Sequence, residues 1–190
     1  PTRRSSDLMG QVSQMCGQAA FEYVIGSIEA VQAGLARAVT TAPLNKEAMH
    51  LAGHYFPGHT EIFAQYSGSQ DYAMMLYDEK LSVIHVSTHI SLSQAISTLT
   101  KERVQQVIEL AGINIEKIKG RKAKIAVAGL NPHASENGLF GNQEELLIAP
   151  AVEAMKDRFD VIGPISPDTV FIRGLKKDFD IVVADRKSVV

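Results

Sequence analysis

The chain has 190 residues, of which 45% are hydrophobic and 21% charged, and its formal net charge at pH 7 is -2. These values describe an ordinary globular protein and exclude a disordered chain, and without a long basic run they argue against nucleic acid as a partner. A single cysteine excludes an internal disulfide and a cysteine-based zinc site, and fits a reducing compartment. No apolar run reaches the about 18 residues of a membrane span, so we expect a cytoplasmic protein with no membrane partner.

Both ends of the chain resemble translated short-read sequencing adapters. Residues 1–8, PTRRSSDL, are encoded by CCTACACGACGCTCTTCCGATCT, and residues 185–190, DRKSVV, by GATCGGAAGAGCGTCGTG. The alternative is a genuine basic N-terminal arm, which requires two independent matches to arise by chance. We therefore expect adapter-derived tails at 1–8 and 185–190 around a natural, partial stretch, 9–184, in which no internal domain boundary is evident.

The N-terminal third of the chain is mostly helical in pattern. Apolar residues at helical spacing predict a helix over 12–34, and the apolar run 36–41 predicts a strand that a proline closes. A short helix is predicted over 45–53, between an asparagine cap and a glycine, and another over about 59–66.

The rest of the chain alternates strands and helices. Two short apolar runs separated by Asp-Glu-Lys predict a hairpin, and so an antiparallel pair within the sheet. The hairpin strands are 72–77 and 81–86, and further strands are predicted over 124–128, 160–162 and 179–183. One or two helices are predicted over 91–110, and another over 142–158. Such alternation predicts a three-layer α/β/α fold with a mixed sheet.

Two histidines follow predicted strands. His89 ends the letters STH at 87–89, and His133 lies within GLNPHASE at 129–136. Open α/β sheets bind ligands at the carboxyl ends of their strands, where two neutral imidazoles can share one divalent cation with a third ligand. A single histidine at a strand end is more often structural, so it is the pair that favours a metal site.

Two further features suit an anion. The letters GHTE at 58–61 begin a predicted helix, where backbone N–H groups, the His59 imidazole and the Thr60 hydroxyl can converge on a phosphate or carboxylate. An ordinary helix cap explains these letters equally well. Lys46, after the predicted strand 36–41, is a second candidate, although most single lysines are only solvated.

Two carboxylates complete the candidates. Glu136 is placed to orient an imidazole or bind a substrate amine, or it is a solvent-facing loop residue. Asp168 lies in a rigid turn before a predicted helix, where an N-cap is the simpler interpretation. No GxGxxG follows a strand, so a Rossmann cofactor site has no support.

In combination, these motifs resemble the 4-hydroxythreonine-4-phosphate dehydrogenase family. The letters TAPLNK at 41–46, GHTE, STH, GLNPHASE and PDT at 167–169 occur in that family's order and approximate spacing, over nearly all of 9–184. The resemblance implies a fold like that of isocitrate and isopropylmalate dehydrogenases, truncated here at both ends. It also implies a homodimer with an active site shared between subunits.

The resemblance assigns roles to several residues. His89 and His133 are implied to be two of three ligands of a divalent metal (zinc, magnesium, cobalt or manganese), and His59 and Thr60 to bind the substrate phosphate. Lys46, Glu136 and Asp168 are counted as further substrate-binding candidates. The third histidine is expected in a YHDQG-like segment after the strand ending at Ala184, which is missing here with most of the NAD site. Ser135 stands where the family form NPHAGE has glycine.

The activity implied for a complete parent is NAD- and metal-dependent oxidation, with decarboxylation, of 4-phosphooxy-L-threonine in pyridoxal phosphate biosynthesis. The alternative within the family is a four-carbon sugar acid 4-phosphate, either erythronate or threonate 4-phosphate. From another class, a phosphate-binding acyltransferase or a non-catalytic domain would hold no metal at the two histidines. The chain by itself is expected to be inactive.

Overall fold

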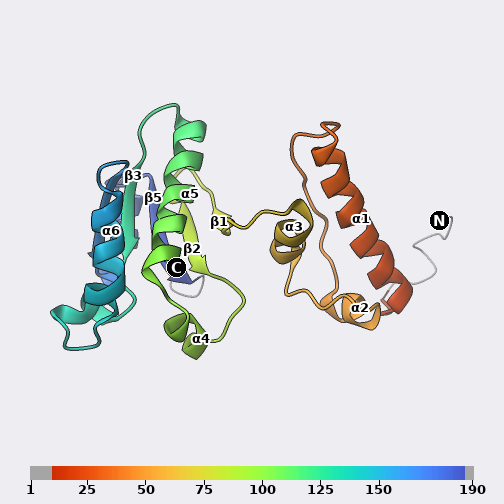
Figure 1. Ribbon diagram of the computed structural model, residues 1–190, viewed down its shortest axis with the longest axis horizontal. Helices are drawn as coiled ribbons and strands as arrows, with labels where there is room; N and C mark the ends of the chain where they lie inside the picture. The colour runs from red at the N-terminus through yellow and green to blue at the C-terminus, as the bar shows by residue number, and fades with distance from the viewer. Residues whose placement is uncertain (1–9, 187–190) are drawn as a thin grey trace. The chain divides into compact units, whose positions relative to one another are not determined.

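The computed structural model describes residues 10–186, so the expected adapter tails lie outside it except for Asp185 and Arg186. The chain divides into two compact units, Pro1–Gln70 and Asp71–Val190 (Figure 1). The sequence pattern had shown no internal boundary. No helix within residues 10–186 has both the length and the apolar character needed to cross a bilayer.

Three helices form the described part of the N-terminal unit, and all three were predicted. They are α1 (Gln14–Gln32), α2 (Lys46–Leu51) and α3 (His59–Ser67). The Ser13 side chain caps α1 by accepting from the Cys16 N–H, and Asn45 caps α2 by accepting from the Ala48 N–H at 2.9 Å. The apolar faces of the helices share a small core of Phe21, Val24, Ile28, Met49 and Ile62.

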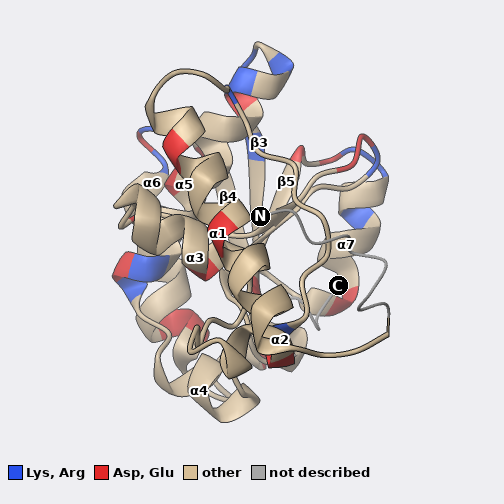
Figure 2. Cartoon of the chain, turned by 90° about the vertical axis from the view of Figure 1, so that its right-hand side faces the viewer, with Lys and Arg blue, Asp and Glu red and all other residues tan. Residues whose placement is uncertain are grey.

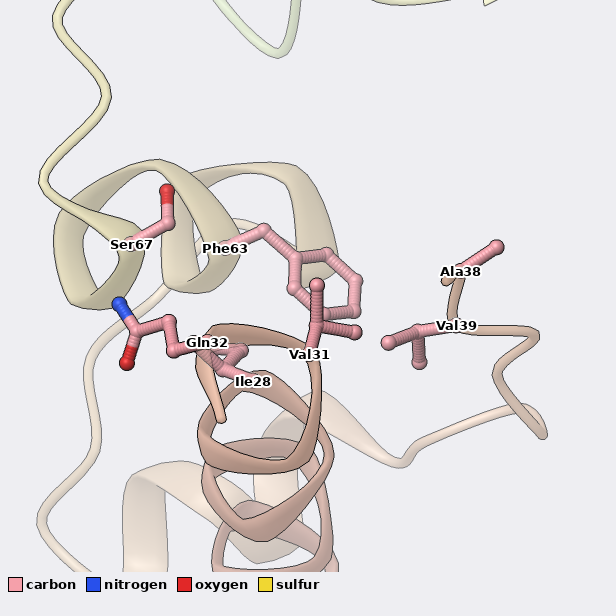
Figure 3. Close-up of a pocket in the computed structure, with 7 residues that line it drawn as sticks. All are labelled: Ile28, Val31, Gln32, Ala38, Val39, Phe63 and Ser67. Carbon is pink, nitrogen blue, oxygen red and sulfur yellow. The ribbon is translucent and has the colours of Figure 1, made fainter. Parts of the chain in front are cut away.

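The strand predicted over 36–41 is wrong. These residues have no regular structure, because the described part of the unit offers no other strand with which their backbone N–H and C=O groups could pair. The segment instead runs past the end of α1. There Ala38 and Val39 help to line an apolar pocket of about 290 Å³, together with Ile28, Val31, Gln32, Phe63 and Ser67 (Figure 3).

A five-stranded sheet forms the centre of the second unit. Its strands are β1 (Met75–Leu76), β2 (Val83–Ser87), β3 (Lys124–Ala128), β4 (Asp160–Ile165) and β5 (Ile181–Arg186). Their order is β1-β2-β5-β3-β4. β1 pairs antiparallel with β2, as the predicted hairpin requires, and the other pairs are parallel. The prediction of a mixed sheet is confirmed.

Helices cover both faces of this sheet. They are α4 (Leu92–Ser97), α5 (Lys101–Lys119), α6 (Ala149–Met155), which continues a π-helical turn Glu144–Ile148, and α7 (Pro167–Leu175). Successive strand residues divide between two cores, as the alternation of side chains along a strand requires. Val127 and Val183 pack in the core with α5 and α6, whereas Ala126 and Val182 pack with α7. The predicted three-layer α/β/α arrangement is therefore confirmed.

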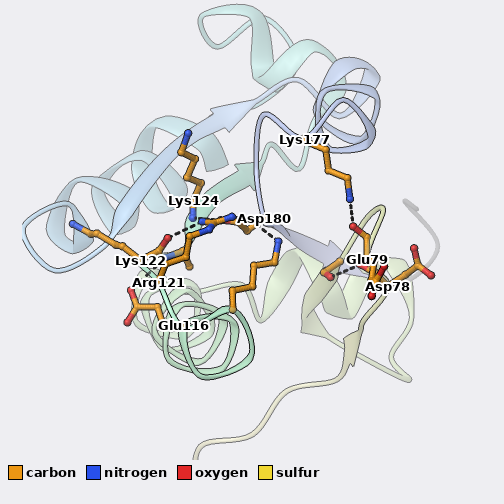
Figure 4. A network of polar contacts seen from close by, with 11 residues as sticks. Asp78, Glu79, Glu116, Arg121, Lys122, Lys124, Lys177 and Asp180 are labelled. Atoms are coloured by element: carbon orange, nitrogen blue, oxygen red, sulfur yellow. Dashed lines mark hydrogen bonds and ion pairs between the residues drawn. The ribbon is translucent and has the colours of Figure 1, made fainter.

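A buried carboxylate fixes the amino-terminal end of β5 (Figure 4). The Asp180 side chain is 7% exposed and accepts from Lys119 Nζ at 2.5 Å, from both terminal nitrogens of Arg121 at 2.7 Å, and from the Lys124 N–H at 2.9 Å. Burial by itself would raise the pKa of Asp180, but these hydrogen bonds outweigh it and hold the pKa well below its ordinary value. By contrast, α7 carries charges of both signs (Figure 2), and the side chains of its Asp168 and Arg173 are 59% and 44% exposed.

We expect Asp180→Asn to lower the free energy of unfolding by about 2–3 kcal/mol, because it removes charge-assisted hydrogen bonds from a buried position. The folded-state pKa is lowered, so the contribution is present above the unfolded pKa of about 3.9 and is lost as pH falls below it. Urea unfolding from pH 7 down to pH 3 measures both effects. Asp178→Asn is the matched control, because its exposed ion pair with Arg173 at 3.1 Å is expected to contribute less than about 1 kcal/mol. Equal losses in the two variants would contradict this account.

Two glycines in α1 provide a test of the N-terminal core. A Cβ at Gly17 would lie 1.9 Å from the Ala48 carbonyl oxygen of α2, whereas a Cβ at Gly26 would meet nothing within 4 Å. We expect Gly17→Ala to destabilise the unit by about 1–3 kcal/mol through overpacking. Gly26→Ala is expected to stabilise it by up to about 1 kcal/mol through helix propensity. Thermal unfolding followed by circular dichroism measures both, and a tolerated Gly17→Ala would show that the two helices do not pack as described.

Candidate functional site

The predicted metal ligands lie at one edge of the sheet. β2, β5, β3 and β4 are parallel, so their carboxyl ends share that edge. His89 follows the end of β2, and His133 follows the end of β3. β5 lies between these two strands, and its Arg186 is level with Ser87 of β2.

The histidine after β3 lies where the sheet's connections diverge. The chain leaving β3 continues to α6 on one face, whereas the chain leaving the adjacent β4 continues to α7 on the other. Such switch points are where open α/β sheets place ligands. Here His133 Nδ1 lies 2.9 Å from Asp168 Oδ2. The pair therefore joins two of the candidates that the sequence singled out.

This contact orients the histidine more than it stabilises the fold. The two side chains are 62% and 59% exposed, so the pair contributes little to stability. Asp168 is the second residue of α7, and its Oδ2 also accepts from the Ser166 hydroxyl at 2.9 Å. The interpretation of Asp168 as an N-cap is not supported, because Ser166 occupies the cap position.

Both candidate ligands have strained backbones. His89 has φ of 58° and His133 has φ of 53°, in the left-handed region that residues other than glycine rarely adopt. Such strain persists only where the surroundings enforce it, and it gathers at functional sites. The two histidines therefore share a structural signature as well as an edge of the sheet.

His133 begins a left-handed turn of six residues. From His133 to Gly138 every φ is positive, between 43° and 91°, and only the last of the six is glycine. A left-handed conformation costs a non-glycine residue roughly 1–2 kcal/mol. The turn therefore needs strong compensating interactions.

A buried carboxylate supplies them. Glu144, which is 4% exposed, opens the π-helical turn before α6. Its Oε1 accepts from the backbone N–H groups of Leu130 and Asn131, both at 2.7 Å. Its Oε2 accepts from Asn131 Nδ2 at 2.9 Å and from the Ser135 hydroxyl. Since a hydrogen bond to a charged group contributes about 1.5–3 kcal/mol, four such bonds are of the size needed to offset the strain.

The protonation state of Glu144 follows from these bonds. Burial acts to raise the pKa of Glu144, but the hydrogen bonds from Asn131 and Ser135 together outweigh burial and lower it. The carboxylate is thus charged at neutral pH. Its contribution to stability is lost only when pH falls below the ordinary range of a glutamate.

In the N-terminal unit, the anion candidates are partly brought together. His59 and Thr60 are the first two residues of α3. The N-cap residue is Gly58, which has no side chain that could accept from the helix's first N–H groups. His59 lines a pocket of about 230 Å³ with the segment 39–44, so the TAPLNK and GHTE motifs meet. Lys46 is exposed at the start of α2, outside the lining of this pocket.

Other predicted relations stay predictions. Glu136 is exposed, and no hydrogen bond or ion pair within the described residues holds its carboxylate. Within residues 10–186 no three His, Cys, Asp or Glu side chains gather closely enough to hold a metal ion. The approach of the anion candidates to the two histidines is a relation between the two units, and it remains an expectation.

Glu144 is the residue that sequence reasoning missed. Its acidic character was interpreted as a favourable charge in the first turn of a helix. The available signal was its spacing, because Glu144 stands four residues before buried Ile148 and seven and eight before buried Ala151 and Val152. A glutamate on the apolar face of a helix indicates a carboxylate with buried partners.

Comparison with known proteins decides the family. The model of the family described as pyridoxal phosphate biosynthetic protein PdxA matches residues 3–185. The chain belongs to the PdxA family. The resemblance inferred from the motifs is thereby confirmed, and the α/β fold of the second unit agrees with it.

Relatives and solved structures carry two kinds of name. D-threonate 4-phosphate dehydrogenase from Pectobacterium atrosepticum is 48% identical over 92% of this chain and 54% of its own length. 4-Hydroxythreonine-4-phosphate dehydrogenase from Beijerinckia indica is 41% identical over 93% of the chain and 52% of its own length. The structure of 4-hydroxythreonine-4-phosphate dehydrogenase from Klebsiella pneumoniae superposes with a TM-score of 0.87 at 46% identity, over 95% of this chain and 56% of that one. The chain thus spans about half the length of the PdxA relatives that it matches.

Ser135 tests the balance between strain and hydrogen bonding in the left-handed turn of this PdxA chain. Ser135→Ala keeps the Cβ at φ of 69° but loses the bond to Glu144, so we expect a loss of about 1.5–3 kcal/mol. Ser135→Gly loses the same bond but relieves the strain, so it should be more stable than the alanine variant by about 1 kcal/mol. Urea unfolding measures the free energy of unfolding of both variants. An alanine variant as stable as the glycine variant would show that the backbone at residue 135 is not strained.

Proposed function

We propose that the longer protein to which this chain corresponds is an NAD-dependent, divalent-metal-dependent dehydrogenase of a four-carbon hydroxy acid phosphorylated at C4. The observation that carries the proposal is the pair of histidines in left-handed conformations, His89 and His133, after two strands that flank β5. Membership in a family whose relatives are dehydrogenases supports it.

The residues present fit a metal. Histidines that bind metals usually donate their second ring nitrogen to a carboxylate, which fixes the ring. His133 has such a partner, because its Nδ1 lies 2.9 Å from Asp168, and this leaves Nε2 for a cation. In the proposed enzyme the third ligand comes from the segment after β5, whose carboxyl end lies between β2 and β3.

Each part of the chain then has a task. A metal bound at His89 and His133 would supply Lewis acidity, lowering the pKa of the substrate's secondary hydroxyl. We propose that oxidation of this carbon passes a hydride to NAD and leaves a β-keto acid, which loses carbon dioxide. The backbone N–H groups at the start of α3, with the side chains of His59 and Thr60, would bind the phosphate and so position the reacting carbon.

Three residues remain candidates for further substrate contacts. Lys46 offers a positive charge to the phosphate or the carboxylate. Glu136 is exposed on the turn that carries His133, where it can approach a substrate amine or hydroxyl. Asp168 acts mainly through His133, which it orients.

The relatives' names favour one substrate over the other. D-threonate 4-phosphate dehydrogenase from Pectobacterium atrosepticum is 48% identical to this chain, and the proteins named 4-hydroxythreonine-4-phosphate dehydrogenase from Klebsiella pneumoniae and Beijerinckia indica are 46% and 41% identical. We therefore propose D-threonate 4-phosphate as the first candidate and 4-phosphooxy-L-threonine as the second. The two differ in a hydroxyl against an amine, and we propose that Glu136 distinguishes these two groups. We further propose a cytoplasmic homodimer whose subunits share each active site.

A chimera tests this function. Residues 10–184 of this chain would replace the matching stretch of the Pectobacterium atrosepticum relative, so that the site is complete. We expect metal-dependent reduction of NAD with D-threonate 4-phosphate, and a loss of at least about a hundredfold in kcat/KM for His133→Ala with the fold intact. His59→Ala should mainly raise KM.

His50→Ala is the matched control, because His50 is exposed on α2 and outside the proposed site. Its kinetics should equal those of the parent chimera. A His133→Ala chimera with full activity would overturn the metal assignment, whereas an unsubstituted chimera that folds but reduces no NAD would favour a phosphate-binding domain without a metal. Faster turnover of 4-phosphooxy-L-threonine would reverse the order of the two substrates.

A further inference from the structure

We propose that Glu144 is the positioning residue for His133: its carboxylate holds the left-handed turn that aims this imidazole at the shared edge of the sheet. The inference rests on the proposed function, because it concerns how that function's metal ligand is placed. Within the described residues no hydrogen bond joins Glu144 to His133. Glu144 contacts residues on both sides of this histidine, namely Leu130 and Asn131 before and Ser135 after.

The position of these contacts supports the assignment. Two bonds fix the backbone where the chain leaves β3, and one fixes the side chain two residues past His133. His133 thus lies in a short arc of chain, residues 130–135, and both ends of this arc are hydrogen-bonded to the same carboxylate. The amide of Asn131 also donates to Gln143 Oε1 at 2.8 Å, which links the arc to the turn that carries Glu144.

Close packing leaves the arc little room to move. A Cβ at Gly129 would lie 2.8 Å from the Ala134 Cβ and 3.2 Å from Glu144 Oε1. Only a glycine allows the strand end, the turn and the carboxylate to approach so closely. On the other side, Oδ2 of Asp168 on α7 lies 2.9 Å from Nδ1 of His133. Glu144 therefore sets the backbone, and Asp168 sets the ring.

The chemistry calls for a carboxylate rather than an amide at this position. All four partners of Glu144 are donors, so both oxygens must accept. In Glu144→Gln the new NH₂ group would face the Asn131 amide, donor against donor. The variant has the same size, so the loss falls on the hydrogen bonds and not on the packing.

Nuclear magnetic resonance of the metal-free chain, with its histidine rings labelled with ¹⁵N, tests the proposal directly. In Glu144→Gln we expect the amide hydrogens of Leu130 and Asn131 to exchange at least about tenfold faster, since their acceptor becomes a neutral amide oxygen in place of a charged carboxylate. The backbone shifts of 133–137 should lose their left-handed signature, and the ring signals of His133 should move. The signals of buried His85, in the middle of β2, should stay in place and so report an intact sheet.

Matched variants separate positioning from general stability. Glu145→Gln removes the same charge from the next residue, which is exposed, and should leave every signal at 133–137 unchanged. If Glu144→Gln also moves His85, then Glu144→Asp decides, because it keeps the charge but withdraws the oxygens from the Leu130 and Asn131 N–H groups. Unmoved His133 signals in a Glu144 variant that retains the His85 signals would overturn the proposal.

A zinc titration of the same samples links positioning to the metal. We expect the zinc concentration that half-saturates the His133 shift to rise about 10–100-fold in Glu144→Gln, the usual cost of losing support behind a ligand. An unchanged value would overturn the proposal even if the turn had loosened. If neither His89 nor His133 of the unaltered chain responds to zinc, the proposed function fails, while the metal-free signals still decide whether Glu144 places His133.

Discussion

The pairing of β5 with both β2 and β3 is the constraint on which the rest of the second unit depends. Parallel hydrogen bonding sets Val182 beside Val83 on one side and beside Ala126 on the other. The carboxyl ends of the three strands are thereby brought to one edge, although β2 and β5 are far apart in the sequence. Without this central strand, the segments that carry His89 and His133 would have no common frame. Asp180, held by Lys119 and Arg121, fixes the opposite end of the same strand.

The strained backbone conformations of His89 and His133 lie at this edge of the sheet, where the chemistry is proposed. A sheet by itself does not turn a histidine into the left-handed region; a local network must enforce it. At His133 the network is the Glu144 carboxylate with its four donors, together with the close approach allowed by Gly129. The same arrangement that costs backbone energy gives the imidazole a defined direction. The stability of the turn and the direction proposed for the His133 ring thus depend on one buried carboxylate.

The sequence predicted much of this because local signals were strong. Most elements were located by amphipathic spacing, by the cap Asn45 and by the buried run of β3, and the motifs located His89, His133 and Asp168. The strand expected over 36–41 failed because β-propensity needs a partner, which no local pattern reports. Glu144 was misjudged for a related reason: its partners lie 9 to 14 residues earlier, across a turn whose backbone sequence patterns do not encode. The contact of His133 with Asp168 likewise depends on strand order, which a single sequence leaves open.

The central claim is that His89 and His133 bind one cation together. X-ray absorption spectroscopy of the chain loaded with one equivalent of zinc measures it most directly, because imidazole rings give a distinct scattering pattern. The account predicts two imidazole nitrogens in the zinc shell, falling to one in His89→Ala and to one in His133→Ala. A zinc shell with no imidazole, or one that neither substitution changes, would contradict it.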